Sequence, residues 1–392
     1  MIYADNAATT KLDTEAFEAM VPWLLDVYSN ASQPYAFARK PKKALVEARA
    51  IIAECINALP EEIFFTSGGT ESDNWAIKGS AYADSKKRVT ITSAFEHHAV
   101  LNSCEAIERL GYPVVYIMPT ADGVITADAL GGMISNTTRL VSVMYANNEI
   151  GTIQPIKELC DVAHSQGALF HSDAVQAVGH VKIDVQDLGV DMLSASAHKF
   201  NGPKGIGFLY IRKGTTISPY ADGGAQENQY RAGTENISSI VGMVAALKVN
   251  CTTLDYNNAY IRSLEHKLLE ELRASRIQFV RNGGNRTIPG LISLSFSGAD
   301  GEAILHRMDL LGICISTGSA CNSVNTKISH VLQAIKIDDV LAKGTIRISL
   351  GKGNTPSDVD SIIEALIRII RWDFNYFIDN LLSYLRQPVC TQ

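Results

Sequence analysis

Strand-like and helix-like stretches alternate through the N-terminal and central parts of the chain, and this alternation limits the folds open to it. Short apolar runs at residues 63–66, 89–93 and 140–145 are each followed by a stretch with helical periodicity. Repeated strand and helix units of this kind are typical of α/β domains with a mainly parallel sheet. We therefore predict a large α/β unit built around such a sheet.

The length of the chain points to a second domain. At 392 residues it exceeds what one hydrophobic core usually supports, and 46% hydrophobic with 19% charged residues is typical of a folded globular protein. From residue 277 onward, strands such as residues 291–296 and 345–350 are mixed with helices. We expect this part to form a smaller α+β domain.

Charge, hydropathy and cysteine usage disfavour several kinds of partner. The net charge is −6, and the basic cluster at residues 39–43 is typical of a solvated helix start, so nucleic acid is not expected. The chain shows no run of about 18 apolar residues and no leader pattern, so we expect a cytoplasmic protein with no membrane partner. Seven cysteines without paired spacing argue against a disulfide framework or a zinc site.

Polar clusters follow many of the predicted strands. In open α/β sheets, ligands gather at the carboxyl ends of the strands, so side chains placed there are expected to converge on one crevice. The clusters lie at residues 66–70, 96–98, 147–149, 173–176 and 196–199.

The last of these clusters carries a lysine in a turn. Ser196, His198 and Lys199 stand between two strand-like runs, residues 191–196 and 205–211. Hydroxyl and imidazole groups can bind a phosphate, and a lysine in apolar surroundings can form a Schiff base with an aldehyde. A phosphate beside an aldehyde describes pyridoxal 5'-phosphate (PLP). A surface lysine at a hairpin turn fits these residues equally well.

Other clusters offer groups that suit the same cofactor. Residues 67–72 place a glycine pair and hydroxyls between a strand and a helix start, which favours an anion, although an unliganded turn has the same pattern. Asp173 could pair with a pyridine nitrogen, Gln176 could reach a ring hydroxyl, and His97 could stack on a ring. Each of the three could equally be an ordinary, satisfied polar group.

Two residues nearer the C-terminus suggest the chemistry. Cys321 lies in a polar, small-residue stretch after a strand, where a thiol has the access that a nucleophile needs, although most free cysteines are structural. Arg347 alternates with apolar residues in a strand and so needs an anionic partner. That partner could be a substrate carboxylate or the acid of an internal ion pair.

Together these motifs resemble the cysteine desulfurases of the NifS/IscS type, within the class V aminotransferase-like PLP enzymes. They occur in the family's order between residues 3 and 351. The matching stretches are YADNAATT, FTSGGTESDNWAIKG, EHHAV, NNEIGT, HSDAVQAVG, SASAHKFNGPKGIG, STGSAC and IRISLG.

The resemblance implies a role for each matching residue. Lys199 would carry PLP, Asp173 would pair with its pyridine nitrogen, and Cys321 would form a persulfide. The remaining roles are the ring hydroxyl contact Gln176, the stacking residue His97, the phosphate cup of Gly69, Thr70, Ser196 and His198, the residue Thr234 that crosses a dimer interface, and the substrate-carboxylate pair Asn148 and Arg347.

The resemblance also implies a reaction and a fold. L-cysteine would become L-alanine as Lys199 removes the Cα proton and the Cys321 thiolate attacks the substrate sulfur. The sulfur would then pass to an acceptor protein, such as a component of iron–sulfur cluster assembly. The fold would be PLP fold type I, a homodimer with a seven-stranded-type sheet in a large domain of residues 14–256. Residues 1–13 and 257–392 would form the small domain.

Two segments depart from the family pattern. The family's Asn-Pro-Ser-Ser-x-His-x-x-Gly-Arg reads NASQPYAFAR at residues 30–39, and its Gln-Glu-Arg reads QEN at residues 226–228. Tyr35 and Asn228 could therefore alter substrate entry or the dimer contact. The alternatives are a selenocysteine lyase, another PLP-dependent β-elimination or transamination, or a non-catalytic PLP-binding partner in sulfur transfer. The spacing after Cys321 resembles members with a longer cysteine loop, which favours a protein acceptor.

Overall fold

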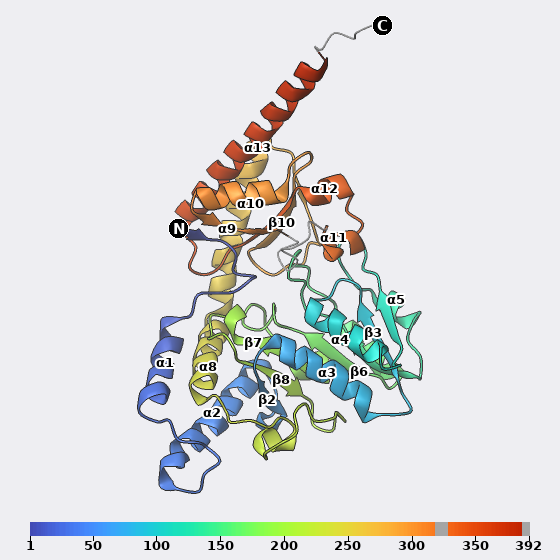
Figure 1. Ribbon diagram of the computed structural model, residues 1–392, viewed down its shortest axis with the longest axis vertical. Coiled ribbons are helices and arrows are strands. Elements are labelled where there is room, and N and C mark those ends of the chain that lie inside the picture. Colours follow the sequence, from blue (N-terminus) through green and yellow to red (C-terminus); the bar gives the residue numbers. More distant parts are fainter. Residues whose placement is uncertain (318–327, 386–392) are drawn as a thin grey trace.

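A seven-stranded sheet forms the centre of the larger unit (Figure 1). The computed structural model describes residues 1–317 and 328–385, and in the last helix the side chains as far as Arg371. The strand order is β2-β8-β7-β6-β5-β3-β4, and β8 alone among these runs antiparallel to both neighbours. The prediction of a mainly parallel, seven-stranded α/β sheet is confirmed. The strands are β2 (Ile63–Thr66), β3 (Val89–Ser93), β4 (Val114–Ile117), β5 (Thr138–Ser142), β6 (Leu169–Asp173), β7 (Met192–Ser196) and β8 (Gly207–Ile211).

Helices cover both faces of this sheet, so its strands are buried on both sides, as parallel strands usually are. Successive residues of one strand belong to different cores: Leu193 packs on one face, and Met192 packs on the other with Trp75. On the Trp75 side lie α3 (Gly69–Ala83) and α4 (His98–Glu108). The opposite core includes residues of α1 (Thr14–Leu25), α2 (Arg39–Ile56), α5 (Ala127–Gly131), α6 (Ile156–Ser165), α7 (Val185–Leu188) and α8 (Ile237–Thr252).

The smaller unit has a core of its own, which includes Ala4, Leu268, Leu294, Met308 and Ile348. Its four-stranded sheet has the order β12-β13-β10-β9 and is antiparallel throughout, while β1 pairs with β11 in parallel. The strands are β1 (Ile2–Tyr3), β9 (Val280–Arg281), β10 (Leu291–Ser295), β11 (Ile313–Cys314), β12 (Ser316–Thr317) and β13 (Thr345–Ser349). The helices are α9 (Leu254–Ala274), α10 (Gly301–Leu310), α11 (His330–Ala334), α12 (Asp339–Lys343) and α13 (Pro356–Leu385). The buried side chains of α11 and α12 pack into the core of the larger unit.

The helical stretch between the two units is broken, although its periodicity predicts one long helix over residues 236–272. The chain bends by 73° between α8 and α9, at Thr253. The hydroxyls of Thr252 and Thr253 donate to the carbonyl of Val249, at 3.0 and 2.8 Å. Such local side-chain bonds satisfy the end of α8 and compete with continuation of the helix. The prediction of one continuous helix is therefore wrong.

None of the described helices is by itself long and apolar enough to cross a bilayer, whereas α8 and α9 together reach the required length and composition in spite of their bend.

Gly207 on β8 brings two parts of the predicted site into contact. It lies opposite Ser196 of β7 and Thr66 of β2 in the sheet register. A Cβ at this position would lie 2.3 Å from the Ala195 carbonyl oxygen and 2.8 Å from the Gly68 Cα. Because both are backbone atoms that cannot move independently, only glycine fits here.

We expect Gly207→Ala to lower the free energy of unfolding by about 1–3 kcal/mol, because the added methyl overpacks a backbone contact. Gly353→Ala is the matched control, since a Cβ there meets nothing within 4 Å. Urea denaturation of the protein without added cofactor checks both variants. Equal midpoints for the two variants would contradict the close-approach argument.

Candidate active site

Lys199 lies at the end of a single 3-10 turn, η3 (Ala197–Lys199), directly after β7. The turn and the antiparallel pairing of β7 with β8 give the strand, turn and strand that the sequence predicts. The Lys199 ammonium is half-buried and donates hydrogen bonds to the carbonyls of Ala7 and, at 2.9 Å, Ala8. The lysine therefore points toward the N-terminal segment at the carboxyl edge of the sheet.

The predicted anion site is formed by the turn between β2 and α3. Gly68 has φ +146°, a conformation that side chains rarely adopt, and a Cβ there would lie 3.3 Å from the Ser196 hydroxyl. Gly69 begins α3, so the first amides of a 15-residue helix face outward here without helical partners. Thr70 follows in the same turn. Glycines, amides and the buried hydroxyl of Ser196 thus form a cradle that favours a phosphate.

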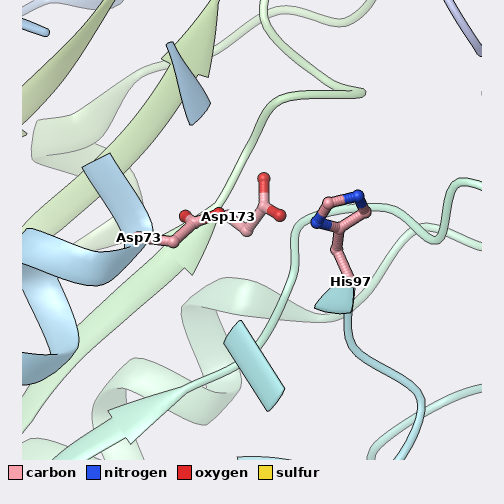
Figure 2. Close-up of side chains that lie close together, drawn as sticks. All are labelled: Asp73, His97 and Asp173. Atoms are coloured by element: carbon pink, nitrogen blue, oxygen red, sulfur yellow. The ribbon is translucent and has the colours of Figure 1, made fainter. Parts of the chain in front are cut away.

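Asp173 and His97 stand opposite one another beside this cradle (Figure 2). Asp173 ends β6 and accepts a bond from the Val175 amide at 2.9 Å, while His97 caps α4 through its Nδ1 and the Ala99 amide at 3.1 Å. Burial raises the pKa of Asp173, an effect opposed by the Val175 amide and by Lys199. Burial lowers the pKa of His97, so its ring is neutral near pH 7. A carboxylate and a neutral ring could hold a heteroaromatic cation between them.

The predicted cofactor residues Gln176 and His198 have protein partners in this structure. The Gln176 amide donates to the Ala7 carbonyl at 2.9 Å, and His198 Nδ1 lies 3.1 Å from the Thr9 hydroxyl. Burial and the nearby charge of Lys199 lower the pKa of His198 to about 4. Both residues therefore border the site and contact the N-terminal segment.

Arg347 is 6% exposed and makes the internal ion pair that its sequence context left open. One Nη lies 2.8 Å from an Asp5 carboxylate oxygen, and the other donates to the Asn148 carbonyl at 3.0 Å. The Nε is buried and has no partner among the described residues. Asp5 and the Asn148 carbonyl thus hold the two Nη atoms of the guanidinium. The buried Nε remains as a donor that a bound carboxylate could use.

The turn that carries Asn148 is built by its neighbour. The Asn147 side-chain oxygen accepts from the amides of Glu149 and Ile150, at 2.8 and 3.0 Å. Burial raises the pKa of Glu149 to about 7, and this carboxyl accepts a bond from Ser329 of the smaller unit. His330 donates to the Glu96 carbonyl at 2.9 Å. The smaller unit therefore docks beside the site through Ser329 and His330.

Two predicted residues are not brought into this cluster. Thr234 is exposed, and its loop is held to the large unit by the ion pair of Arg231 with Glu71, at 2.8 Å. Within the described part of the chain, Thr234 has no hydrogen bond to another predicted site residue. Cys321 lies outside the described residues.

Two acidic residues of the site were not predicted. Asp5 lies two residues after the end of β1, and an acid at a strand end is the same signal that identified Asp173. Asp73 lies four residues after Gly69 on the buried face of α3, with Ser72, Ala76 and Ile77. An acid on a buried helix face is unusual unless it is paired, and that spacing could have revealed it.

One group among the described residues could in principle ligate a metal ion: Asp73, His97 and Asp173, with one ligand atom of each within 4.8 Å of the others. Two of these residues match the predicted cofactor site. The Lys199 ammonium and the His97 ring both lie near the Asp173 carboxylate, beside the phosphate cradle. The whole set fits a ligand with an anionic end and a nitrogen-containing ring better than a lone cation.

Comparison with known proteins agrees with this geometry. Residues 2–362 match the family described as Aminotransferase class-V. A cysteine desulfurase IscS of Dictyoglomus turgidum is 46% identical over 94% of this chain and 94% of its own length. A cysteine desulfurase IscS of Methanosarcina thermophila is 43% identical over 94% of this chain and 92% of its own length.

Solved structures give the same result. A NifS-like protein superimposes with a TM-score of 0.89 at 34% identity, covering 95% of this chain and 99% of its own. A structure titled "SspA in complex with cysteine" has a TM-score of 0.80 at 35% identity, covering 91% of this chain and 100% of its own. The chain therefore belongs to the class V aminotransferase family, among the cysteine desulfurases of the NifS/IscS type.

Proposed function

We propose that this protein is a PLP-dependent cysteine desulfurase that converts L-cysteine to L-alanine and passes the sulfur through Cys321. One observation carries the proposal. Arg347, the predicted substrate-carboxylate residue, pairs directly with Ser316 in the sheet register, and Cys321 follows five residues later (321 minus 316). The strand that pairs with the predicted substrate-carboxylate residue therefore ends just before Cys321 in the sequence.

PLP would be held by the groups described above. The glycine turn before α3 and Ser196 would bind its phosphate. Asp173 would pair with its ring nitrogen, and Lys199 would form the Schiff base with its aldehyde. When bound, PLP supplies an electron sink for the bonds at the substrate's Cα. The neutral His97 ring would cover one face of the cofactor without adding a second positive charge beside its nitrogen.

Lys199 and Arg347 would act on the substrate itself. Arg347 binds the α-carboxylate, using the Nε that is buried without a partner, while Asp5 and the Asn148 carbonyl fix its orientation. Lys199 takes the Cα proton, because the amine that would hold the cofactor's aldehyde would lie beside the Cα of a substrate bound there. Ser329 and His330 bond to Glu149 and to the Glu96 carbonyl beside this space.

Sulfur transfer would follow as a displacement at the substrate sulfur. The Cys321 thiolate attacks that sulfur, an S–S bond forms and the C–S bond breaks, and its electron pair stays with the carbon. Protonation of that carbon, together with return of the proton to Cα from Lys199, gives alanine and leaves a persulfide on Cys321. An acceptor protein, for example one that assembles iron–sulfur clusters, would then remove the outer sulfur.

Cys321→Ala should abolish formation of both alanine and sulfide from cysteine, because the acceptor of the sulfur is lost, while the visible absorbance of the bound cofactor remains. Cys314→Ala, a half-buried thiol in the same region, is the control and should keep both products. Alanine is measured by amino-acid analysis and sulfide colorimetrically, with a thiol reductant present. Full activity in Cys321→Ala would sink the persulfide route, and a keto acid in place of alanine would favour β-elimination or transamination.

Lys199→Ala should lower the rate of alanine formation by about 10²–10⁴-fold, because the general base is removed. The variant should also lose PLP on gel filtration, since the covalent attachment is gone. Lys204→Ala, five residues further on and exposed, should retain both activity and cofactor. Retention of PLP by Lys199→Ala at wild-type level would argue against Lys199 as the attachment point.

We also propose that the active form is a homodimer, with α1 and the following segment at the contact. Large apolar side chains are exposed there: Leu25 is 70% and Tyr28 is 76% exposed, and Phe17, Leu24, Tyr35 and Phe37 are also exposed. A second copy of the chain fits this surface because apolar patches of this kind mark protein interfaces, and because Thr234 does not reach its own site.

Leu25→Asp combined with Tyr28→Asp should shift the protein from dimer to monomer, because two charges would be buried at the contact. Leu310→Asp is the control, as Leu310 is 85% exposed on α10 of the smaller unit. Size-exclusion chromatography with light scattering at micromolar concentration measures the outcome. A wild-type monomer, or a dimeric double variant, would refute this contact.

A further inference from the structure

A second carboxyl lies directly behind Asp173. Asp73 comes from α3, is 1% exposed, and has one oxygen within 4.8 Å of a ligand atom of both Asp173 and His97. Figure 2 shows it beside Asp173, on the side away from the His97 ring. Asp173 lies between Asp73 and the His97 ring. A cofactor ring held between Asp173 and His97 would therefore contact Asp173 and not Asp73.

Few groups around Asp73 stabilise the ionised form of its carboxyl. Its side chain hydrogen-bonds to Ser194 of β7, and its Oδ1 has no partner among the described residues. The His171 Nε2 lies 3.7 Å away, but this imidazole is bonded to the Ser194 hydroxyl at 2.9 Å and to the Ser142 hydroxyl at 2.9 Å. Burial lowers the pKa of His171 to about 3, so it is neutral and forms no ion pair with Asp73.

Every charged group that does face Asp73 opposes its ionisation. Burial raises the pKa of Asp73 well above its ordinary value, and the neighbouring acids Asp173 on β6 and Glu96 in the turn before α4 add to this effect. Asp173, by contrast, has the Val175 amide and the Lys199 ammonium to favour its own charge. Two buried carboxyl groups this close cannot both be ionised. Asp173 carries the charge, because its ionised form has more stabilising neighbours, and Asp73 keeps its proton.

We propose that Asp73 is a positioning residue that stays protonated behind Asp173, so that the pair presents a single carboxylate to the cofactor's ring nitrogen. The inference rests on the proposed PLP site. One negative charge is enough to hold a ring proton, and a second would have to be buried without a cation. Asp73 then keeps Asp173 in place through packing and its bond to Ser194 rather than through charge.

The pH dependence of stability tests this in the protein without cofactor. An acid whose pKa is raised in the folded state is protonated there while it is already ionised in the unfolded chain. Its contribution to stability is therefore lost progressively as the pH rises from about 4 toward the folded-state pKa. Asp73→Asn imitates the protonated form at every pH and removes this loss. Thermal unfolding should show a smaller fall in Tm between pH 5 and pH 8 in Asp73→Asn than in the wild type.

Asp84→Asn at the end of the same helix is the matched control. Backbone amides lower the pKa of Asp84, so it is ionised throughout this range and its replacement should leave the slope unchanged. Any pH-independent effect of the asparagine on stability cancels, because only the change of Tm with pH is compared between the proteins. An equal or steeper fall of Tm in Asp73→Asn would overturn the inference. If that variant does not fold, Asp73→Ser, which is also neutral, gives the same comparison.

Cofactor binding supplies the second readout. PLP titrated into the apoprotein should bind Asp73→Asn within about threefold of the wild type, whereas Asp73→Ala, which leaves a cavity beside Asp173, should bind about tenfold more weakly. A tenfold loss in Asp73→Asn would show that the charge itself is needed and would refute the proposal. Failure of the wild type to bind PLP would instead refute the proposed function, while the Tm slopes would still decide the protonation of Asp73.

Discussion

The site depends on the N-terminal segment at residues 5–10, which lies between the two units and bonds to both. The Ala7 carbonyl accepts from Lys199 and Gln176 of the large unit, while the Asp5 carboxylate holds Arg347 of the small one. Backbone carbonyls are obligatory acceptors, so their direction fixes where the lysine lies. The relative position of the lysine and the arginine is therefore set by one short stretch of chain.

The same segment couples the site to the small core. Asp5 bridges to Ser349 at the end of β13, and the Ser349 hydroxyl accepts from the Ala7 amide at 2.9 Å. Arg347 lies two residues earlier on that strand, and Ser316 pairs with it. A shift of the small unit would consequently move the substrate-carboxylate group and the start of the Cys321 segment together relative to Lys199.

Buried acids are concentrated around this site. Asp73, Glu96 and Asp173 are all nearly inaccessible to solvent, and burial raises the pKa of each, that of Glu96 to about 8. Such groups lower the stability of the protein without its ligand, so they are retained where function needs them. A cationic ring nitrogen would compensate part of this cost, and ligand binding should then stabilise the fold.

The sequence by itself determined the parallel sheet and the residues at its carboxyl edge, because strand periodicity and the strand-end rule are local signals. Lys199, Asp173 and His97 all follow from them. Asp5 and Asp73 became part of the site only through tertiary structure, since their partners Arg347 and Asp173 lie far away in the chain. The bend at Thr253 could not be predicted from periodicity either. Hydroxyl bonds to the Val249 carbonyl end α8, but they do not change the helical pattern of the sequence. Only the tertiary structure shows which charged and polar groups interact with one another. Their interaction depends on distance and burial in the folded protein, not on position in the sequence.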